Sequence, residues 1–312
     1  MTKHAVAATA LAAALAACAP TEPVATASPA PDARFAVTDT TDYDPMTVNT
    51  LPAAPPTLKV AYGSASARQY GELRMPKGPN HGNGPFPLAV IYHGGCWAGM
   101  GGTANVGALA SFLAANGVAT WTPSYRELGS DGGWPNTFAD WAQGLGYVKT
   151  LAETYPLDLG RITVMGHSAG VTPVMWLATG NKGDAVVSGE LPAVRAAVAI
   201  DGPLRIADFV GMDAAVCGQP VIAGMMGGTP AEVPARYAML DPLANKPMVR
   251  KLMVVDGALP DPDPAMIDAL RAQGIAVEVI RVAQDQHFNM LVPGTRDFAA
   301  IGPSLLAIAS GR

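Results

Sequence analysis

The sequence Arg161-Ile-Thr-Val-Met-Gly-His-Ser-Ala-Gly170 joins an apolar run to the pattern G-x-S-x-G. Residues 161–165 are expected to form a buried strand, and a helix is expected from residue 169 to about residue 179. In such a strand–turn–helix unit the serine lies on a sharp turn that projects its hydroxyl above the sheet. The two glycines keep side chains out of the tight crossing. The pattern predicts Ser168 as a nucleophile at the end of a strand.

Apolar runs and helical stretches alternate on both sides of this motif. The expected strands cover residues 58–63, 69–75, 88–92, 118–122, 194–200, 249–255 and 275–282, and the expected helices cover 105–116, 136–155, 264–273 and 295–310. Such alternation predicts an α/β fold, with a mostly parallel central sheet and helices on both faces. Residues 203–247 are rich in Pro, Gly and Met, and we expect a small insertion over the active edge of the sheet.

The composition favours one large folded domain and excludes other classes of protein. The chain has 312 residues, of which 49% are hydrophobic and 14% charged, and its formal net charge is −5. A chain this apolar and weakly charged is not disordered. It has no basic run, whereas a nucleic-acid-binding protein needs a basic surface. We therefore expect no nucleic-acid partner.

The first 18 residues, MTKHAVAATALAAALAAC, have the form of a secretory signal peptide. The Ala/Leu run is too short for a transmembrane helix of about 20 residues. Its ending, Leu15-Ala-Ala-Cys18, resembles a bacterial lipobox. This predicts lipidation of Cys18 and anchoring in the cell envelope, at an outer membrane facing the periplasm. An ordinary signal peptide with a periplasmic or secreted product is the alternative. Residues 19–57, rich in Pro, Ala and Thr, are expected to be a tether, and residues 58–312 the folded domain.

The segment His93-Gly-Gly-Cys-Trp97 directly follows the expected strand that ends at Tyr92. Acyl transfer to a serine needs backbone N–H donors at the developing oxyanion, and glycines let the backbone turn those groups into a pocket. The predicted donors are Gly94, Gly95 and Ala169. Cys96 is an alternative to one glycine, and His93 is expected to brace the loop. Trp97 is a candidate wall of the substrate pocket, with ordinary core packing as the alternative.

A serine nucleophile needs a general base, which is normally a histidine. The five histidines are His4, His81, His93, His167 and His287. His287 alone follows a late strand, which agrees with the chain order serine, acid, histidine of this fold. We therefore predict His287 as the base.

The acid that orients the imidazole is expected in the loop after residues 249–255. That loop offers three aspartates, in the sequence Asp256-Gly-Ala-Leu-Pro-Asp261-Pro-Asp263. Asp261 is the predicted acid, with Asp263 second and Asp256 third. Apart from Cys18, the chain has two cysteines, Cys96 and Cys217. The sequence leaves open whether they form a disulfide or remain free thiols.

Together these motifs resemble the serine α/β-hydrolases, and among them the bacterial esterases of the feruloyl-esterase-like, kynurenine-formamidase-like and hormone-sensitive-lipase-like group. The matching segments, over residues 58–310, are Tyr62-Gly63 with Arg68-Gln69, HGGCW, Tyr125-Arg126, Gly133-Trp134-Pro135, GHSAG, and Gly227-Gly228 with Asp241-Pro242-Leu243. The resemblance implies a triad of Ser168, Asp261 and His287, with Trp134 and Tyr125-Arg126 framing the pocket. Two departures are Val171, where the family has a further glycine, and Asp256-Gly257, where the acid loop has His-Gly.

The resemblance implies hydrolysis of short- to medium-chain, aryl or acetyl carboxylic esters through an acyl-enzyme, with a small ester as partner and without a metal or organic cofactor. A prolyl-oligopeptidase-type peptidase and an arylformamidase would use the same triad. A catalytically silent envelope-binding lipoprotein is the alternative outside enzymology, but it would be expected to lose the nucleophile, the base or the loop glycines.

Overall fold

The computed structural model describes residues 1–2, 32–79, 81–179, 186, 189–282 and 286–312. The chain divides into two units, Met1–Asp32 and Ala33–Arg312. The predicted lipidation site Cys18, residues 3–17 of the predicted signal peptide and residues 19–31 of the predicted tether lie outside the described residues. Among the described residues, no helix combines the length and the apolar character that crossing a membrane requires.

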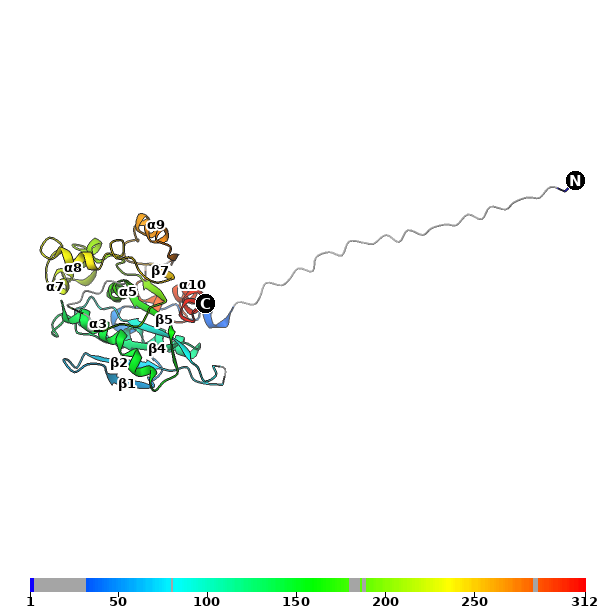
Figure 1. The fold of residues 1–312 in the computed structure, drawn as a ribbon, viewed down its shortest axis with the longest axis horizontal. Helices are drawn as coiled ribbons and strands as arrows, with labels where there is room; N and C mark the ends of the chain where they lie inside the picture. The colour runs from blue at the N-terminus through cyan, green and yellow to red at the C-terminus, as the bar shows by residue number, and fades with distance from the viewer. Residues whose placement is uncertain (3–31, 80, 180–185, 187–188, 283–285) are drawn as a thin grey trace. The chain divides into compact units, whose positions relative to one another are not determined.

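The second unit is built around one eight-stranded sheet with the order β1-β2-β4-β3-β5-β6-β7-β8. The strands are β1 (Leu58–Ala61), β2 (Tyr70–Arg74), β3 (Phe86–Tyr92), β4 (Ala119–Pro123), β5 (Leu157–His167), β6 (Ala196–Ile200), β7 (Lys251–Asp256) and β8 (Ala276–Arg281). β1 and β2 pair antiparallel, as do β2 and β4, and all later pairs are parallel. In Figure 1 the labelled strands run from β1 and β2 at the bottom of the view to β7 at the top. The predicted mostly parallel α/β sheet is confirmed.

Helices follow most strands and cover the sheet. The α-helices are α1 (Pro45–Val48), α2 (Gly107–Ala115), α3 (Asn136–Gly146), α4 (Val148–Ala152), α5 (Val171–Ala178), α6 (Asp213–Cys217), α7 (Ile222–Met226), α8 (Pro234–Met239), α9 (Pro264–Ala272) and α10 (Arg296–Ala309). The short 3-10 helices are η1 (Ala33–Phe35), η2 (Thr103–Val106), η3 (Ser168–Gly170), η4 (Ile206–Phe209) and η5 (Asn289–Leu291). The expected insertion therefore contains η4 and the three short helices α6–α8.

Both faces of the central strand β3 are buried, and its residues alternate between two apolar cores. Leu88, Val90 and Tyr92 pack in the core that includes α3, α4, α5 and α9. Ala89 and Ile91 pack in the core that includes α2 and α10. Since successive side chains of a strand point to opposite faces, a strand buried on both sides reads as a continuous apolar run. This explains why the sequence predicted these strands well.

Residues 33–57, predicted as part of a tether, contact the folded domain. Val48 is buried, and the N–H of Tyr43 donates to the Asn289 side chain over 2.8 Å. The N–H of Ala54 donates to the Ser111 hydroxyl, also over 2.8 Å. The compact unit begins at Ala33, so the boundary expected at residue 58 lies too late in the chain. Composition alone hid this because the segment is held by a few apolar side chains, such as Val48 and Phe35, and by hydrogen bonds to distant parts of the chain.

Candidate active site

Ser168 lies on a strained turn at the carboxyl end of β5. It is the first residue of η3, directly before α5, and its backbone has φ of +55°. A non-glycine residue in this left-handed region is uncommon and persists only where the surrounding structure holds it. The expected strand–turn–helix unit with the serine at its apex is present.

Three glycines permit this turn. A Cβ added to Gly166 would overlap the carbonyl oxygen of Gly170, and one on Gly170 would overlap that of Tyr92. Gly202, after β6, is as tightly placed, because a Cβ there would overlap the carbonyl oxygen of Ser168. Only glycine has the room for such close backbone approaches.

His287 and Asp201 meet at the same edge of the sheet. The Nδ1 atom of His287 lies 2.6 Å from Oδ2 of Asp201, the residue that directly follows β6. The Asp201 side chain is 2% exposed and that of His287 is 19% exposed. A short contact with a buried carboxylate fixes the orientation of an imidazole and stabilises its protonated form. The pair thus has the geometry of a general base and its orienting acid.

The loop after β7 surrounds the Asp201 carboxylate. The N–H groups of Ala258 and Leu259 donate to its two oxygens over 3.0 and 3.1 Å. A Cβ on Gly257 would lie 3.0 Å from the carboxyl carbon, so this glycine lets the loop close on the acid. Burial opposes ionisation, but the hydrogen bonds from His287 and Leu259 outweigh it, and the pKa of Asp201 is below its ordinary value.

The sequence-based assignment of the acid to Asp261 is wrong, because this residue does not reach the imidazole. Its carboxylate accepts from the guanidinium of Arg281 over 2.6 Å, and its side chain is 65% exposed. Asp256 is buried and also accepts from Arg281, over 2.7 Å. Asp263 caps the N-terminus of α9. The loop after β7 therefore supplies backbone donors to the acid, and the acid itself follows β6.

Two further histidines brace the site, and burial keeps both neutral. His167, directly before Ser168, places Nε2 2.8 Å from the carbonyl oxygen of His287, and their rings lie 4.4 Å apart. Desolvation lowers the pKa of His167 to about 3 and that of His93 to about 4. As neutral rings they donate to carbonyl groups, His93 to that of Gly94 over 2.8 Å. Sequence analysis missed the role of His167, which links the Ser168 turn to the His287 loop.

The loop with the predicted oxyanion donors lies against the nucleophile. A Cβ on Gly94 would come within 3.0 Å of Cβ of Ser168. Gly95, Cys96 and Trp97 all have positive φ, at 111°, 54° and 53°. Three consecutive residues of this kind turn the loop sharply after β3. The structure thus brings the loop of Gly94 and Gly95 to Ser168 and, with it, to the adjacent Ala169.

An apolar pocket opens beside Ser168. It is lined by Cys96, Trp97, Ser168, Ala169, Pro203, Phe209, Asp213, Val216, Cys217, Ile222 and Leu259. Its volume is about 340 Å³, including the open mouth. Trp97 is one of the lining residues and is also buried in the apolar core, so both interpretations of this residue agree with its position. The walls on the opposite side come from η4, α6 and α7, so the insertion covers the nucleophile.

Trp134 is not among the residues of this pocket. Its ring packs edge-on against Phe138 and lies under the guanidinium of Arg236, 4.9 Å from that group. It therefore joins α3 to the insertion. Tyr125 is also a brace, because its hydroxyl donates to the carbonyl oxygen of His93 over 2.7 Å. The interactions of Trp134 and Tyr125 described here stabilise the surrounding loops.

No group of three or more His, Cys, Asp or Glu in the described part of the chain could hold a metal ion. Cys96 and Cys217, which the sequence left open as a disulfide or two free thiols, form a disulfide with a Cα–Cα distance of 5.9 Å.

The sheet and the turn at Ser168 define an α/β-hydrolase-type protein. Residues 77–246, more than half of the chain, match the family model BD-FAE, and the chain belongs to this family. A comparison with curated proteins found no match.

Solved structures with the same fold are esterases by title. Esterase B of Lactobacillus rhamnosis has a TM-score of 0.65 and 17% identity, covering 83% of this chain and 89% of its own. A truncated carbohydrate esterase from gut microbiota has a TM-score of 0.63 and 18% identity, and the match covers 81% of this chain and 95% of that esterase. Esterase 2 of Thermogutta terrifontis has a TM-score of 0.63 and 15% identity, and the match covers 83% of this chain and 94% of that esterase. A bifunctional GH43-CE protein of Bacteroides eggerthii has a TM-score of 0.61 and 21% identity. The match covers 81% of this chain but only 38% of that protein, so this chain spans less than half of its length.

Proposed function

We propose that this protein is a serine esterase that hydrolyses carboxylic esters with Ser168 as nucleophile, His287 as general base and Asp201 as orienting acid. The observation that carries the proposal is the 2.6 Å contact between His287 Nδ1 and the buried Asp201 carboxylate. His167, the residue before Ser168, joins the His287 loop to the strained turn of the serine. The esterase titles of the structural neighbours and the BD-FAE match support the same class of reaction.

The reaction has two steps. Nε2 of His287 takes the hydroxyl proton of Ser168, and Oγ attacks the ester carbonyl carbon. The tetrahedral intermediate collapses as the imidazolium returns the proton to the leaving alcohol, which leaves an acyl-enzyme. Water, deprotonated by the same histidine, then attacks the acyl-enzyme and releases the carboxylic acid. Asp201 stays ionised throughout and stabilises the imidazolium.

The backbone N–H groups of Gly94 or Gly95, together with that of Ala169, stabilise the oxyanion. This assignment rests on the approach of Gly94 to Cβ of Ser168 and on the positive φ of Gly95. Donors held in place before the reaction need no reorganisation when negative charge develops, and losing one typically lowers kcat about 10²–10³-fold.

The acyl group is short. The space that water-sized groups can occupy in the pocket at Ser168 is only about 30 Å³, far below the range for ligand sites of about 300–1,000 Å³, so it leaves room for a small group only. Its apolar walls, among them Trp97, Phe209 and Ile222, suit an unbranched alkyl chain. The titles of structural neighbours name bound propionate for one esterase and C4-C4 and C6-C4 inhibitors for another, of which the first is a tributyrin phosphonate. We therefore infer a preference for acetyl to butyryl esters.

Covalent labelling tests this function. A fluorophosphonate probe should label the wild-type protein at Ser168, and Ser168→Ala should abolish both the labelling and the hydrolysis of p-nitrophenyl acetate. Folded wild-type protein that neither reacts with the probe nor cleaves p-nitrophenyl esters from acetate to octanoate would contradict the proposal.

We also propose that the protein is lipid-anchored in the bacterial envelope through Cys18. The lipobox-like ending of the Ala/Leu run supports this, and the Cys96–Cys217 disulfide suits an oxidising compartment. In bacteria given a labelled fatty acid, wild-type protein should incorporate label and sediment with membranes. Cys18→Ala should do neither, and equal sedimentation of the two proteins would contradict the anchor.

A further inference from the structure

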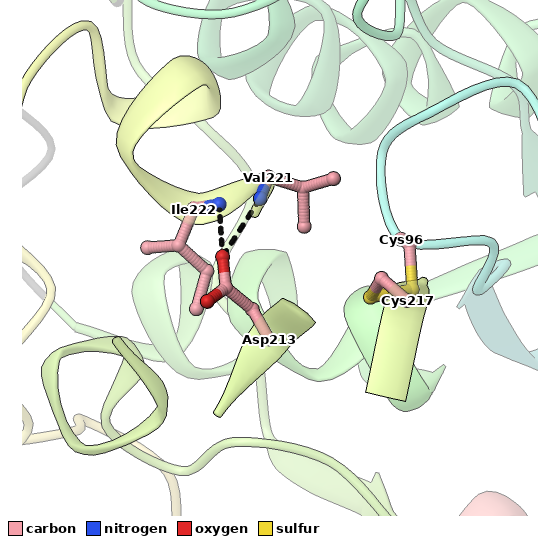
Figure 2. The surroundings of a disulfide bond; sticks show 5 residues. All are labelled: Cys96, Asp213, Cys217, Val221 and Ile222. Carbon is pink, nitrogen blue, oxygen red and sulfur yellow. Dashed lines mark hydrogen bonds between the residues drawn. A yellow bond between two sulfur atoms is a disulfide. The ribbon is translucent and has the colours of Figure 1, made fainter. Parts of the chain in front are cut away.

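The Cys96–Cys217 disulfide joins two neighbouring segments that both line the pocket at Ser168. The sulfurs link residues 121 positions apart in the sequence, and both cysteines line the pocket at Ser168. Cys96 belongs to the loop after β3, and Cys217 is the last residue of α6 in the insertion. Figure 2 shows this bridge. It therefore forms part of the wall of the acyl site.

α6 has little packing of its own to hold it in place. Of its five residues only Asp213 is buried, and Val216, which lines the pocket, is 43% exposed. A helix this short gains little from its own hydrogen bonds and depends on tertiary contacts. The position of this wall therefore depends on the few interactions that connect α6 to the rest of the molecule.

Asp213 provides one of these connections, at the opposite end of α6. Its Oδ2 accepts from the N–H groups of Val221 and Ile222 over 2.7 and 2.8 Å (Figure 2). Ile222 also lines the pocket. Asp213 thus connects α6 to α7, and both of these helices belong to the insertion. The disulfide is the covalent connection from α6 to the loop that lies against Ser168.

The loop on the other side of the bridge needs external support. Cys96 and Trp97 are non-glycine residues with positive φ, a strained conformation that persists only where the surrounding structure holds it. The carbonyl of Trp97 accepts from the N–H of Leu128 over 2.6 Å, and the disulfide holds Cys96. One bond thus connects the loop of the oxyanion donors with the wall that faces the acyl chain.

We propose that the Cys96–Cys217 disulfide is a positioning element that sets acyl-chain specificity, by holding α6 as a close wall of the pocket at Ser168. The proposal rests on the esterase function proposed above. When the bridge opens, α6 moves outward and longer acyl chains fit. The site then loses discrimination against long esters.

The test measures kcat/KM for p-nitrophenyl acetate and octanoate with purified full-length protein in three forms: oxidised wild type, wild type treated with dithiothreitol, and Cys217→Ser. Reduction yields two protein thiols while the reagent closes to its own cyclic disulfide, and alkylation with mass spectrometry verifies the thiols. Cys217→Ser removes the bridge and leaves Cys96 in the loop. Ala215→Ser, an exposed change on the same helix, is the matched control.

We expect the octanoate-to-acetate ratio of kcat/KM to rise about ten-fold or more in both opened forms, since one methylene in an apolar pocket changes kcat/KM by about 10–200-fold. The change should appear mainly as a lower KM for octanoate. Ala215→Ser should keep the wild-type ratio, and dithiothreitol should have no effect on Cys217→Ser. These readouts separate a specificity role from a general loss of stability, which would lower both rates together.

An unchanged ratio in protein whose thiols are verified would overturn the proposal, as would an equal fall of both rates in folded protein. If Cys217→Ser does not fold, the reduced wild type, checked by circular dichroism, provides the same comparison. Oxidised wild type that cleaves no ester and takes no fluorophosphonate would instead refute the esterase function, and this inference with it.

Discussion

Replacing the buried acid provides the sharpest test of the site. Asp201→Asn keeps the shape of the side chain and removes its charge. Asp201 uses one oxygen for Ala258 N–H and His287 and the other for Leu259 N–H. An asparagine at this position has only one oxygen. If it faces Leu259, the amide N–H points at His287 Nδ1, and the imidazole proton moves to Nε2, where it blocks proton uptake from Ser168.

If the asparagine oxygen faces His287 instead, the tautomer is retained, but Leu259 loses its acceptor and the imidazolium loses its counter-charge. Two unit charges about 4 Å apart interact by about 4 kcal/mol at an effective dielectric constant of 20, which corresponds to roughly 10³-fold in rate. A wrong tautomer lowers kcat by about 10⁴-fold in serine proteases. We therefore expect kcat to fall by about 10³–10⁴-fold in Asp201→Asn.

The matched control is Asp261→Asn. This carboxylate is mostly exposed and paired with Arg281, and such pairs contribute about 0–1 kcal/mol. Its kcat should stay within about three-fold of wild type. The assay is the initial rate of p-nitrophenyl acetate hydrolysis, with Ser168→Ala as the background and thermal melting as the check on folding. Near wild-type activity in Asp201→Asn, with a large loss in Asp261→Asn, would refute the assignment of the acid.

Three further changes test other parts of the argument. At pH 5 His167 is protonated in the unfolded chain, where its pKa has the ordinary value of 6.5. It is neutral in the folded protein, where its pKa is about 3. Stability should therefore fall from about pH 6.5 downward, by about 2 kcal/mol between pH 7 and 5 through this group, and urea titrations of His167→Gln should show a shallower decline. In Gly202→Ala the added Cβ displaces the Ser168 turn, so kcat should fall about 100-fold, and unchanged kinetics would count against the turn geometry. Asp140→Ala leaves the buried guanidinium of Arg126 without its carboxylate and should lower the free energy of unfolding by about 3–5 kcal/mol in urea; a loss below about 1 kcal/mol would contradict this.

The positions of Ser168 and His287, the proposed nucleophile and base, could be predicted because their signals are local. Ser168 lies in a pattern whose glycines are required by backbone crossings a few residues away. His287 lies in the loop after the last strand. The sheet was predictable for a similar reason, since strands such as β3 are continuous apolar runs bounded by turns. Each of these signals lies within one segment of the chain.

The acid could not be predicted because its identity depends on where two distant loops run. Asp201 follows β6 directly, and Asp256 ends the neighbouring strand β7, so both lie at the same edge of the sheet. Arg281, paired with Asp256 across β7 and β8, engages that carboxylate. The one signal in the sequence was the dipeptide Asp201-Gly202 at the end of an apolar run, which gave no reason to prefer it over three later aspartates.

The helix expected over residues 136–155 is divided into α3 and α4, with Tyr147 between them. The division is slight, because Tyr147 keeps right-handed helical backbone angles, and the N–H groups of Tyr147 and Leu151 each donate to the carbonyl group four residues earlier. This continuity explains why the apolar pattern predicted a single helix. A Cβ on Gly144 would lie 2.8 Å from Cβ of Pro123, so α3 packs closely on the end of β4.

The site assigns different roles to three histidines through burial. His93 and His167 are fully enclosed, and desolvation lowers the pKa of each to about 4 or below, so at neutral pH each is an uncharged donor to a carbonyl oxygen. Neither can take up the serine proton efficiently, because a useful general base needs a pKa near the working pH. His287, the proposed base, is partly exposed, and its Nδ1 contacts the Asp201 carboxylate, whose pKa is below its ordinary value. The neutral histidines and the loop glycines therefore hold the geometry, and the buried carboxylate of Asp201 holds the ring of His287 in place.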